Sequence, residues 1–214
     1  MKLDKKHENR MEFIADVSTS FANMVRRYSI SRVPVLAIDQ VTFYDNSSPL
    51  WDEYIAHRLG LLPITTPEKT PESAEIVFSL DAEGPKTVYS SEMKSSDKDI
   101  KVAKSIPIAT LGPNQHLRFE SKAILGIGRK HAKFQAGIVS YGKEGDSLRF
   151  MVESCCQMEP AEVIGRACDV IIDDIEAVEE ALGKKPAKKA KKAKKTEEKE
   201  EKEEKKAKKK EKED

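Results

Sequence analysis

Residues 20–66 read SFANMVRRYSISRVPVLAIDQVTFYDNSSPLWDEYIAHRLGLLPITT, and this stretch decides the fold of the chain. Its first part predicts an amphipathic helix over residues 20–31, because apolar side chains recur there at intervals of three and four. Hydroxyl oxygens at residues 18–20 are suited to cap its start, and Pro34 stops it shortly after its end. The apolar face of this helix consists of Phe21, Met24, Val25 and Tyr28.

The rest of the stretch predicts a strand, a turn and a second helix. Residues 35–44 are rich in the β-branched and aromatic side chains that favour a strand. The run DNSSP at residues 45–49 is a strong turn signal. A short helix is expected over residues 50–59, ended by Gly60, with Pro63 just beyond it.

Further strands are expected where apolar and polar residues alternate between turn signals. Residues 11–17 place Met11, Phe13, Ala15 and Val17 on one face. Other strands are predicted over 76–80, 117–125, 134–141 and 148–152. A helix over 160–182, with Pro160 in its first turn and Gly183 as its C-cap, follows them. Its broad apolar stripe contains Val163, Ile164, Ala167, Cys168, Val170, Ile171, Ile175, Val178 and Leu182.

The opening stretch resembles the signature of the archaeal RNA polymerase D subunit, the counterpart of the bacterial alpha subunit. In that family a helix of the form N-x-x-R-R-x-x-x-x-x-V-P precedes a strand, an acidic turn and D-E-x-I-A-H-R-L-G-L-x-P. Further similarity lies at residues 86–90, 106–108 and 126–134, so the match runs from about residue 11 to 182. The two signature motifs are matched by Asn23, Arg26, Arg27, Val33 and Pro34, and by Asp52, Glu53, Ile55, Ala56, His57, Arg58, Leu59, Gly60, Leu61 and Pro63.

The resemblance implies an α+β fold with an alpha-subunit-like dimerisation lobe and an inserted lobe. Residues 1–49 and 143–183 would form the discontinuous dimerisation lobe. Residues 50–142 would form the inserted β-rich lobe. A charged C-terminal tail, residues 184–214, would follow.

The last 31 residues differ sharply in composition from the rest of the chain. They contain 16 Lys and 9 Asp or Glu, with no large apolar residue. Such a segment cannot bury enough surface to offset its ordering entropy, so we expect it to be disordered or transiently helical. Residues 1–183 keep 22 basic and 28 acidic residues. This acidic body is a poor surface for a phosphate backbone, which needs clustered Lys and Arg.

Composition also bounds the cellular setting. No apolar run approaches the length of a membrane span, and no secretory h-region is present, so we expect no membrane association. Three cysteines without paired spacing suggest free thiols and a cytoplasmic protein. They also make a poor zinc or iron–sulfur site. Many D subunits carry a cysteine-rich ferredoxin-like insertion near this point, whereas only residues 142–147 lie between two expected strands here. We therefore expect no iron–sulfur cluster and no other cofactor.

Two further patterns admit a catalytic interpretation, and each has a simpler explanation. His57 lies one turn after Glu53, a spacing that suits local helix stabilisation. The pair Gly126 and Gly128 resembles the start of a phosphate-binding loop, but Lys130 and His131 occupy the place of the third glycine. A tight β connection or bulge is the expectation there. An enzyme built around His131 or His57 lacks a nucleophile to pair with either.

The family resemblance implies a non-catalytic scaffold subunit of DNA-dependent RNA polymerase. Its partners would be the small alpha-like L subunit as a heterodimer, the small N and P subunits, and the second-largest catalytic subunit. DNA would be contacted only indirectly. In this family the arginine pair at residues 26–27 lies where the dimer meets the large subunits, and the apolar helix stripe suits a partner helix. The expected interface residues are Phe21, Val25, Arg26, Arg27, Tyr28, His57, Arg58, Val163, Ala167, Val170, Ile171 and Val178. The alternative is a stand-alone interaction module tethered to nucleic acid by its Lys-rich tail, with salt-sensitive binding.

Overall fold

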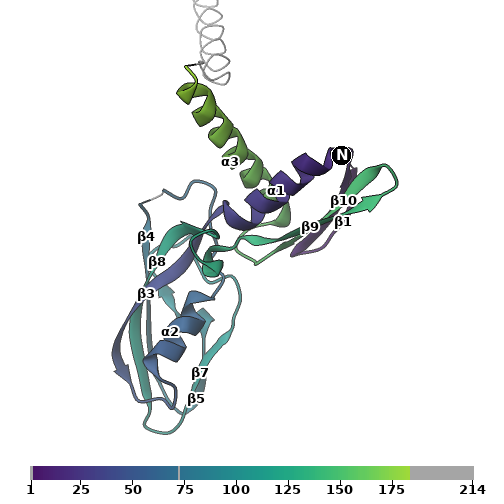
Figure 1. Ribbon diagram of the computed structural model, residues 1–214. Helices are drawn as coiled ribbons and strands as arrows, with labels where there is room; N and C mark the ends of the chain where they lie inside the picture. The colour runs from purple at the N-terminus through teal and green to yellow at the C-terminus, as the bar shows by residue number, and fades with distance from the viewer. Residues whose placement is uncertain (1, 72, 184–214) are drawn as a thin grey trace, which may run out of the picture. The chain divides into compact units, whose positions relative to one another are not determined.

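The computed structural model describes residues 2–71 and 73–183, so the expectations for the tail, residues 184–214, lie outside the described residues. Contacts divide the chain into two units, Met1–Cys168 and Asp169–Asp214. The described residues form a mixed α and β structure, mostly sheet, with three α-helices (Figure 1).

The first sheet has the strand order β1-β2-β10-β9. All its neighbouring strands are antiparallel. The alternation predicted for β2 is confirmed, since Met11, Phe13 and Ala15 are buried. The Phe13 ring stacks on that of Phe150, with 4.9 Å between ring centroids. The four strands are β1 (Lys2–Lys6), β2 (Arg10–Ala15), β9 (Gly137–Glu144) and β10 (Ser147–Ser154).

Helix α1 (Thr19–Ser31) packs against this sheet, as Figure 1 shows beside β9. Ser18 is its N-cap, and the Ser18 hydroxyl accepts a hydrogen bond from the backbone N–H of Phe21 at 3.3 Å. The predicted helix and its cap are confirmed. The buried line, however, runs along Ala22, Val25 and Ser29, while Phe21 remains 43% exposed. Small side chains let the helix approach the sheet closely, and Phe21 lies at the rim.

The second sheet has the order β3-β8-β4-β6, and β5 and β7 form a separate antiparallel pair. Helix α2 (Asp52–Gly60) covers this region through Ile55 and Leu59, which are fully buried. These two side chains join Phe78 and Phe119 in one apolar core. The strands are β3 (Pro34–Asn46), β4 (Glu75–Glu83), β5 (Lys86–Tyr89), β6 (Lys94–Ser95), β7 (Pro107–Leu111) and β8 (His116–Ile127).

Strand β3 contributes to both cores. Val35 and Ala37 belong to the core under α1, whereas Leu36 and Ile38 belong to the core under α2. Because successive side chains of a strand point to opposite faces, four consecutive apolar residues fit a strand that is covered on both sides. The continuous run VLAI therefore joins the two cores.

One predicted strand starts too early in the sequence. Phe134 belongs to a short 3-10 helix, η2 (Ala132–Phe134), and β9 begins only at Gly137. His131 Nδ1 accepts a hydrogen bond from the N–H of Lys133 at 3.1 Å, which holds this turn. The Phe134 ring then packs against β8 at Gly126, where an added Cβ would lie 2.7 Å from ring atoms. The strand expectation is wrong for residues 134–136, because burial of this ring favours the turn.

Sequence patterns also missed β1, β5, β6 and β7. Strand β1 is almost entirely charged, and Leu3 is 55% exposed. Backbone pairing with β2 and an ion pair between Asp4 and Arg149 hold it at the sheet edge. An edge strand of this kind has no buried face and so no alternating pattern to read.

The lobe boundaries expected at residues 50 and 143 stay a prediction, and β9 pairs with β10 across the second of them.

Candidate functional site

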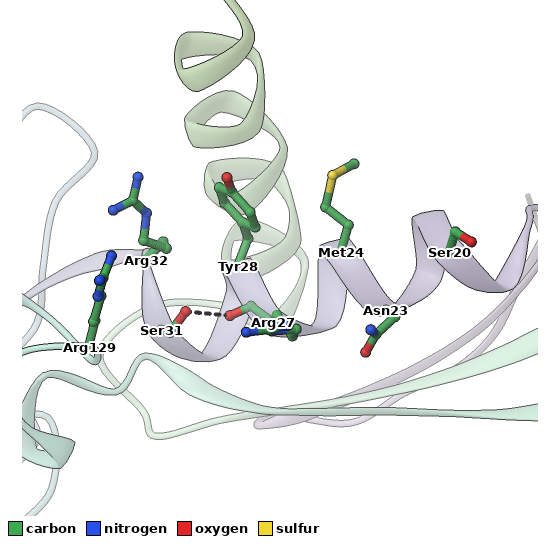
Figure 2. A pocket seen from close by; sticks show the side chains of 8 residues that line it. All are labelled: Ser20, Asn23, Met24, Arg27, Tyr28, Ser31, Arg32 and Arg129. Carbon is green, nitrogen blue, oxygen red and sulfur yellow. Dashed lines mark hydrogen bonds between the residues drawn. The ribbon is translucent and has the colours of Figure 1, made fainter. Parts of the chain in front are cut away.

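An arginine pocket lies on the outer side of α1 (Figure 2). Its volume is about 680 Å³. Three guanidinium groups line it, from Arg27 and Arg32 near the end of the helix and from Arg129 just after β8. The other lining residues are Ser20, Asn23, Met24, Tyr28 and Ser31.

Backbone contacts bring Arg129 to α1. Its N–H donates to the carbonyl oxygen of Ser31 at 2.9 Å, and the Ser31 hydroxyl donates to the carbonyl of Arg27 at 2.7 Å. Gly128 lies so close to the Ile30 carbonyl that a side chain there would collide with it. The glycine pair at 126 and 128 therefore marks close packing of backbone and ring, while the pairing of β8 with β3 has no bulge at Gly126.

The arginines of this region have different surroundings. The Arg26 guanidinium donates to Asn23 Oδ1 at 3.0 Å. The Arg32 guanidinium lies over the Tyr28 ring, 5.7 Å from its centroid. Neither Arg27 nor Arg129 has an ion-pair partner within the described part of the chain. Of the two arginines in the sequence motif, Arg27 lines the pocket and Arg26 does not, and no local pattern pointed to Arg32 or Arg129.

A second cavity, of about 260 Å³, lies between α2 and the segment that follows β8. It brings together His57 and His131, which are 74 positions apart in the sequence. Lys133 Nζ donates to Asp39 Oδ1 at 2.6 Å, and this bond holds the pKa of Asp39 below its usual value. No nucleophile joins the histidines among the residues that line this cavity.

The exposed side of α2 carries aromatic and basic side chains. Trp51 is 80% exposed and Tyr54 63% exposed, and His57 and Arg58 follow them toward the helix end. Arg58 Nη2 donates to the carbonyl of Pro107 at 2.6 Å, so this guanidinium also ties α2 to β7. Trp and Tyr are enriched at protein interfaces. Trp51 and Tyr54 therefore add to His57 and Arg58, the interface residues expected on this helix.

Helix α3 (Pro160–Ala181) divides into two differently buried parts. Val163 and Ala167 lie fully buried in the core of the first unit, and the side chain of Val25 in α1 is also buried. Buried side chains have no exposed area to offer a partner. Val25, Val163 and Ala167 are therefore not part of the interface that we propose below.

In the second unit, the described part of α3 exposes a row of large apolar residues. Ile171 is buried and Val170 half-buried, but Ile175, Val178 and Leu182 are 52%, 58% and 70% exposed. Their spacing of three and four places them on one side of the helix. We call Ile175, Val178 and Leu182 the α3 stripe.

The remaining observations concern metals and membranes. Among residues 2–71 and 73–183, no three His, Cys, Asp or Glu side chains are grouped so that they could hold a metal ion. The three cysteines form no disulfide. None of the described helices combines the length and apolar character that a membrane span needs.

Comparison with known proteins first places the chain in a broad class. Residues 38–140 match the model of the RNA polymerase Rpb3/RpoA insert domain. These residues begin within β3 and end within β9, so they include most of the second sheet, the β5–β7 pair and both cavity-lining histidines.

Similar curated proteins then define the family. The chain is 40% identical to DNA-directed RNA polymerase subunit Rpo3 of Methanocaldococcus jannaschii, over 84% of this chain and 96% of that protein. It is 44% identical to Rpo3 of Pyrococcus furiosus over 65% of this chain, and it spans 56% of that relative's length. Rpo3 of Halobacterium salinarum is 39% identical over 64% of this chain and 55% of its own length. The chain belongs to the Rpo3 family of archaeal, alpha-like RNA polymerase subunits.

Proposed function

We propose that this chain is the larger alpha-like subunit of a DNA-directed RNA polymerase and that it serves assembly rather than catalysis. The observation that carries this function is the 40% identity to an Rpo3 subunit across nearly the whole of that relative. Polymerase activity then belongs to the complex, and this chain supplies a platform. We place the complex in the cytoplasm.

The first partner in this proposal is the small alpha-like L subunit. The α3 stripe supports it, because three large apolar side chains are left in solvent on one side of a helix. Burying such a stripe against a partner helix is favourable by roughly 25 cal/mol per Å² of apolar surface. Val178 keeps its place in the proposed interface, and Ile175 and Leu182 join it. Ile171 leaves it because its side chain is buried, and Val170 leaves it because it lies on another side of the helix from the α3 stripe.

The heterodimer would then bind the second-largest catalytic subunit and the small N and P subunits. Side chains on α1 and α2 support this role. Phe21 and Arg27 are exposed on α1, where Arg26 and Tyr28 are half-buried, and His57 and Arg58 are exposed on α2. Planar guanidinium forks suit polar anchoring at the rim of such interfaces.

We further propose that the chain holds no iron–sulfur cluster. In support, β9 and β10 are joined by only Gly145 and Asp146, and Gly145 adopts a φ of +61°. A two-residue hairpin turn leaves no room for a cluster-binding insertion at this point.

The direct test is affinity purification of the tagged full chain from its native cells at moderate salt. Subunit stoichiometry would be read by mass spectrometry, and template-directed RNA synthesis would be assayed in the eluate. Stoichiometric recovery with a small alpha-like chain, two very large chains and activity supports the proposal. Recovery of the chain alone would contradict it.

The L contact has its own test in a matched pair of variants. Val178→Asp places an unpaired carboxylate in the proposed apolar contact, which costs several kcal/mol, so heterodimer recovery should fall at least about tenfold. Ala177→Asp adds the same charge at an exposed position off the α3 stripe and should leave recovery near wild type. Equal recovery of the two variants would remove the α3 stripe from the interface.

The alternative of a free module tethered by its Lys-rich tail receives no support from the comparisons. That alternative predicts that removing residues 184–214 abolishes nucleic-acid binding, and that the chain does not assemble with polymerase subunits in the first place. The polymerase proposal predicts that the truncated chain still assembles.

A further inference from the structure

We infer that the α3 stripe accepts a helix whose own apolar stripe is flanked by Lys or Arg, and that acidic side chains beside the α3 stripe keep it from pairing with a second copy of this chain. This inference rests on the proposed function, because it gives the chemistry of the partner at that contact. It goes further in naming the charges that select a foreign partner over a copy of the same chain.

The first support is that this part of α3 carries charge of one sign. Residues 169–182 contain six acidic residues and no Lys or Arg. The last turn of α3 likewise has no basic side chain. Acidic side chains three or four positions apart repel each other, and near a helix C-terminus they oppose the macrodipole. These charges therefore weaken the helix on its own, and a basic surface on a partner would offset that cost.

The second support is the place of two of these acids. Glu179 follows Ile175 by four positions and precedes Leu182 by three, so it neighbours both members of the α3 stripe on the helix surface. Glu176 precedes Glu179 by three positions and continues the same line. Both side chains are half-buried. We call Glu176 and Glu179 the acidic edge of the α3 stripe.

A second copy of the chain would set acid against acid at this edge. Helices that pack through apolar stripes bring the side chains beside the two stripes together, and the charges there set partner choice. Because residues 169–182 contain no basic group, the acidic stretches repel each other whether two copies run parallel or antiparallel. A helix flanked by Lys or Arg meets the same edge with opposite charge. Repulsion of the wrong partner adds to attraction of the right one in producing specificity.

The full-length chain can be tested with two labelled probe helices that share one apolar stripe and carry either Lys or Glu beside it. In fluorescence anisotropy at about 50 mM salt, the Lys-flanked probe should bind at least about tenfold more tightly than the Glu-flanked probe. At about 500 mM salt this ratio should shrink, because charges at a solvent-exposed contact are then screened over a much shorter distance.

A matched pair of double variants locates the charges responsible. Glu176→Lys combined with Glu179→Lys should abolish or reverse the preference for the Lys-flanked probe. Asp169→Lys combined with Asp173→Lys changes the net charge equally, at exposed positions on the opposite side of the helix, and should keep most of that preference. Equal effects of the two double variants, or equal binding of both probes by the wild-type chain, would overturn the inference. Neutralisation of the acidic edge by the chain's own Lys-rich segment would give the second of these results.

Sedimentation of the full-length chain tests the exclusion of a second copy. At low salt, the wild-type chain should associate with the Glu176→Lys, Glu179→Lys variant at least about threefold more tightly than with itself. A wild-type pair as tight as the mixed pair would show that the acidic edge does not exclude a second copy.

Recovery of the small alpha-like chain separates this inference from the proposed function. At low salt, recovery should fall at least about fivefold with the Glu176→Lys, Glu179→Lys variant and stay near wild type with the Asp169→Lys, Asp173→Lys control. If the wild-type chain recovers no polymerase subunit, the proposed function fails. If wild-type recovery is stoichiometric and the two double variants recover equal amounts, only the role of the acidic edge fails.

Discussion

Replacing Gly126 by alanine should destabilise the chain through a single, well-defined collision. An added Cβ would lie 2.7–2.8 Å from three atoms of the Phe134 ring, and Phe134 is fully buried. Forcing extra volume into a packed core costs about 1–3 kcal/mol. Replacing glycine by alanine in a strand also raises the free energy of unfolding by about 0.5–1 kcal/mol, because it lowers the entropy of the unfolded chain. We expect a net destabilisation of about 0.5–2 kcal/mol.

Gly142→Ala provides the control. Gly142 also lies in a strand, β9, but nothing stands within 4 Å of its added Cβ. This variant receives only the entropic gain and should be neutral or slightly more stable than wild type. The free energies of unfolding of the two variants, from urea titrations, should therefore differ by about 1–3 kcal/mol.

A double-mutant cycle locates the cause. In a Phe134→Leu background the smaller side chain leaves room at Gly126, so the cost of Gly126→Ala should shrink by about 1 kcal/mol or more. Identical unfolding midpoints for Gly126→Ala and Gly142→Ala would refute the packing argument. So would strict additivity with Phe134→Leu, because the two side chains would then not interact.

Two further predictions concern polar groups. Thr66→Val should lower the free energy of unfolding by about 1–3 kcal/mol, because the buried N–H of Leu36 donates to the Thr66 hydroxyl at 3.0 Å and would lose its acceptor. Thr66→Ser keeps a hydroxyl and should retain most of the wild-type stability. A valine variant as stable as wild type in urea titrations would contradict this prediction. Asp39→Asn should be less stable than wild type at pH 7, with the gap closing at pH 3, since a carboxyl whose pKa is lowered by Lys133 stabilises the fold above pH about 4 and loses that contribution as pH falls. A gap that is the same at both pH values would count against the Asp39–Lys133 bond. Asp45→Asn is the control, because Asp45 is an exposed carboxyl near the end of β3.

Local patterns predicted the major elements where one physical signal dominated. The alternation of Met11, Phe13 and Ala15 identified β2, and the spacing in residues 160–182 identified α3. Patterns failed where the chain has no buried face, as in β1, or where one residue's packing overrides local preference, as with Phe134. The family was also recognisable from the motifs around Arg26 and His57, and the similarity to Rpo3 proteins confirms it.

The sequence by itself determined the family, most of the secondary structure and the presence of apolar helix surfaces, because each follows from residues near one another in the chain. Tertiary structure decided which of those surfaces remain available: Val163 and Ala167 are buried in the chain's own core, while Val178 is exposed. It also decided that Arg129 joins Arg27 in one pocket. Burial and charge clustering depend on contacts between distant segments, and a pattern along the chain does not encode those distances.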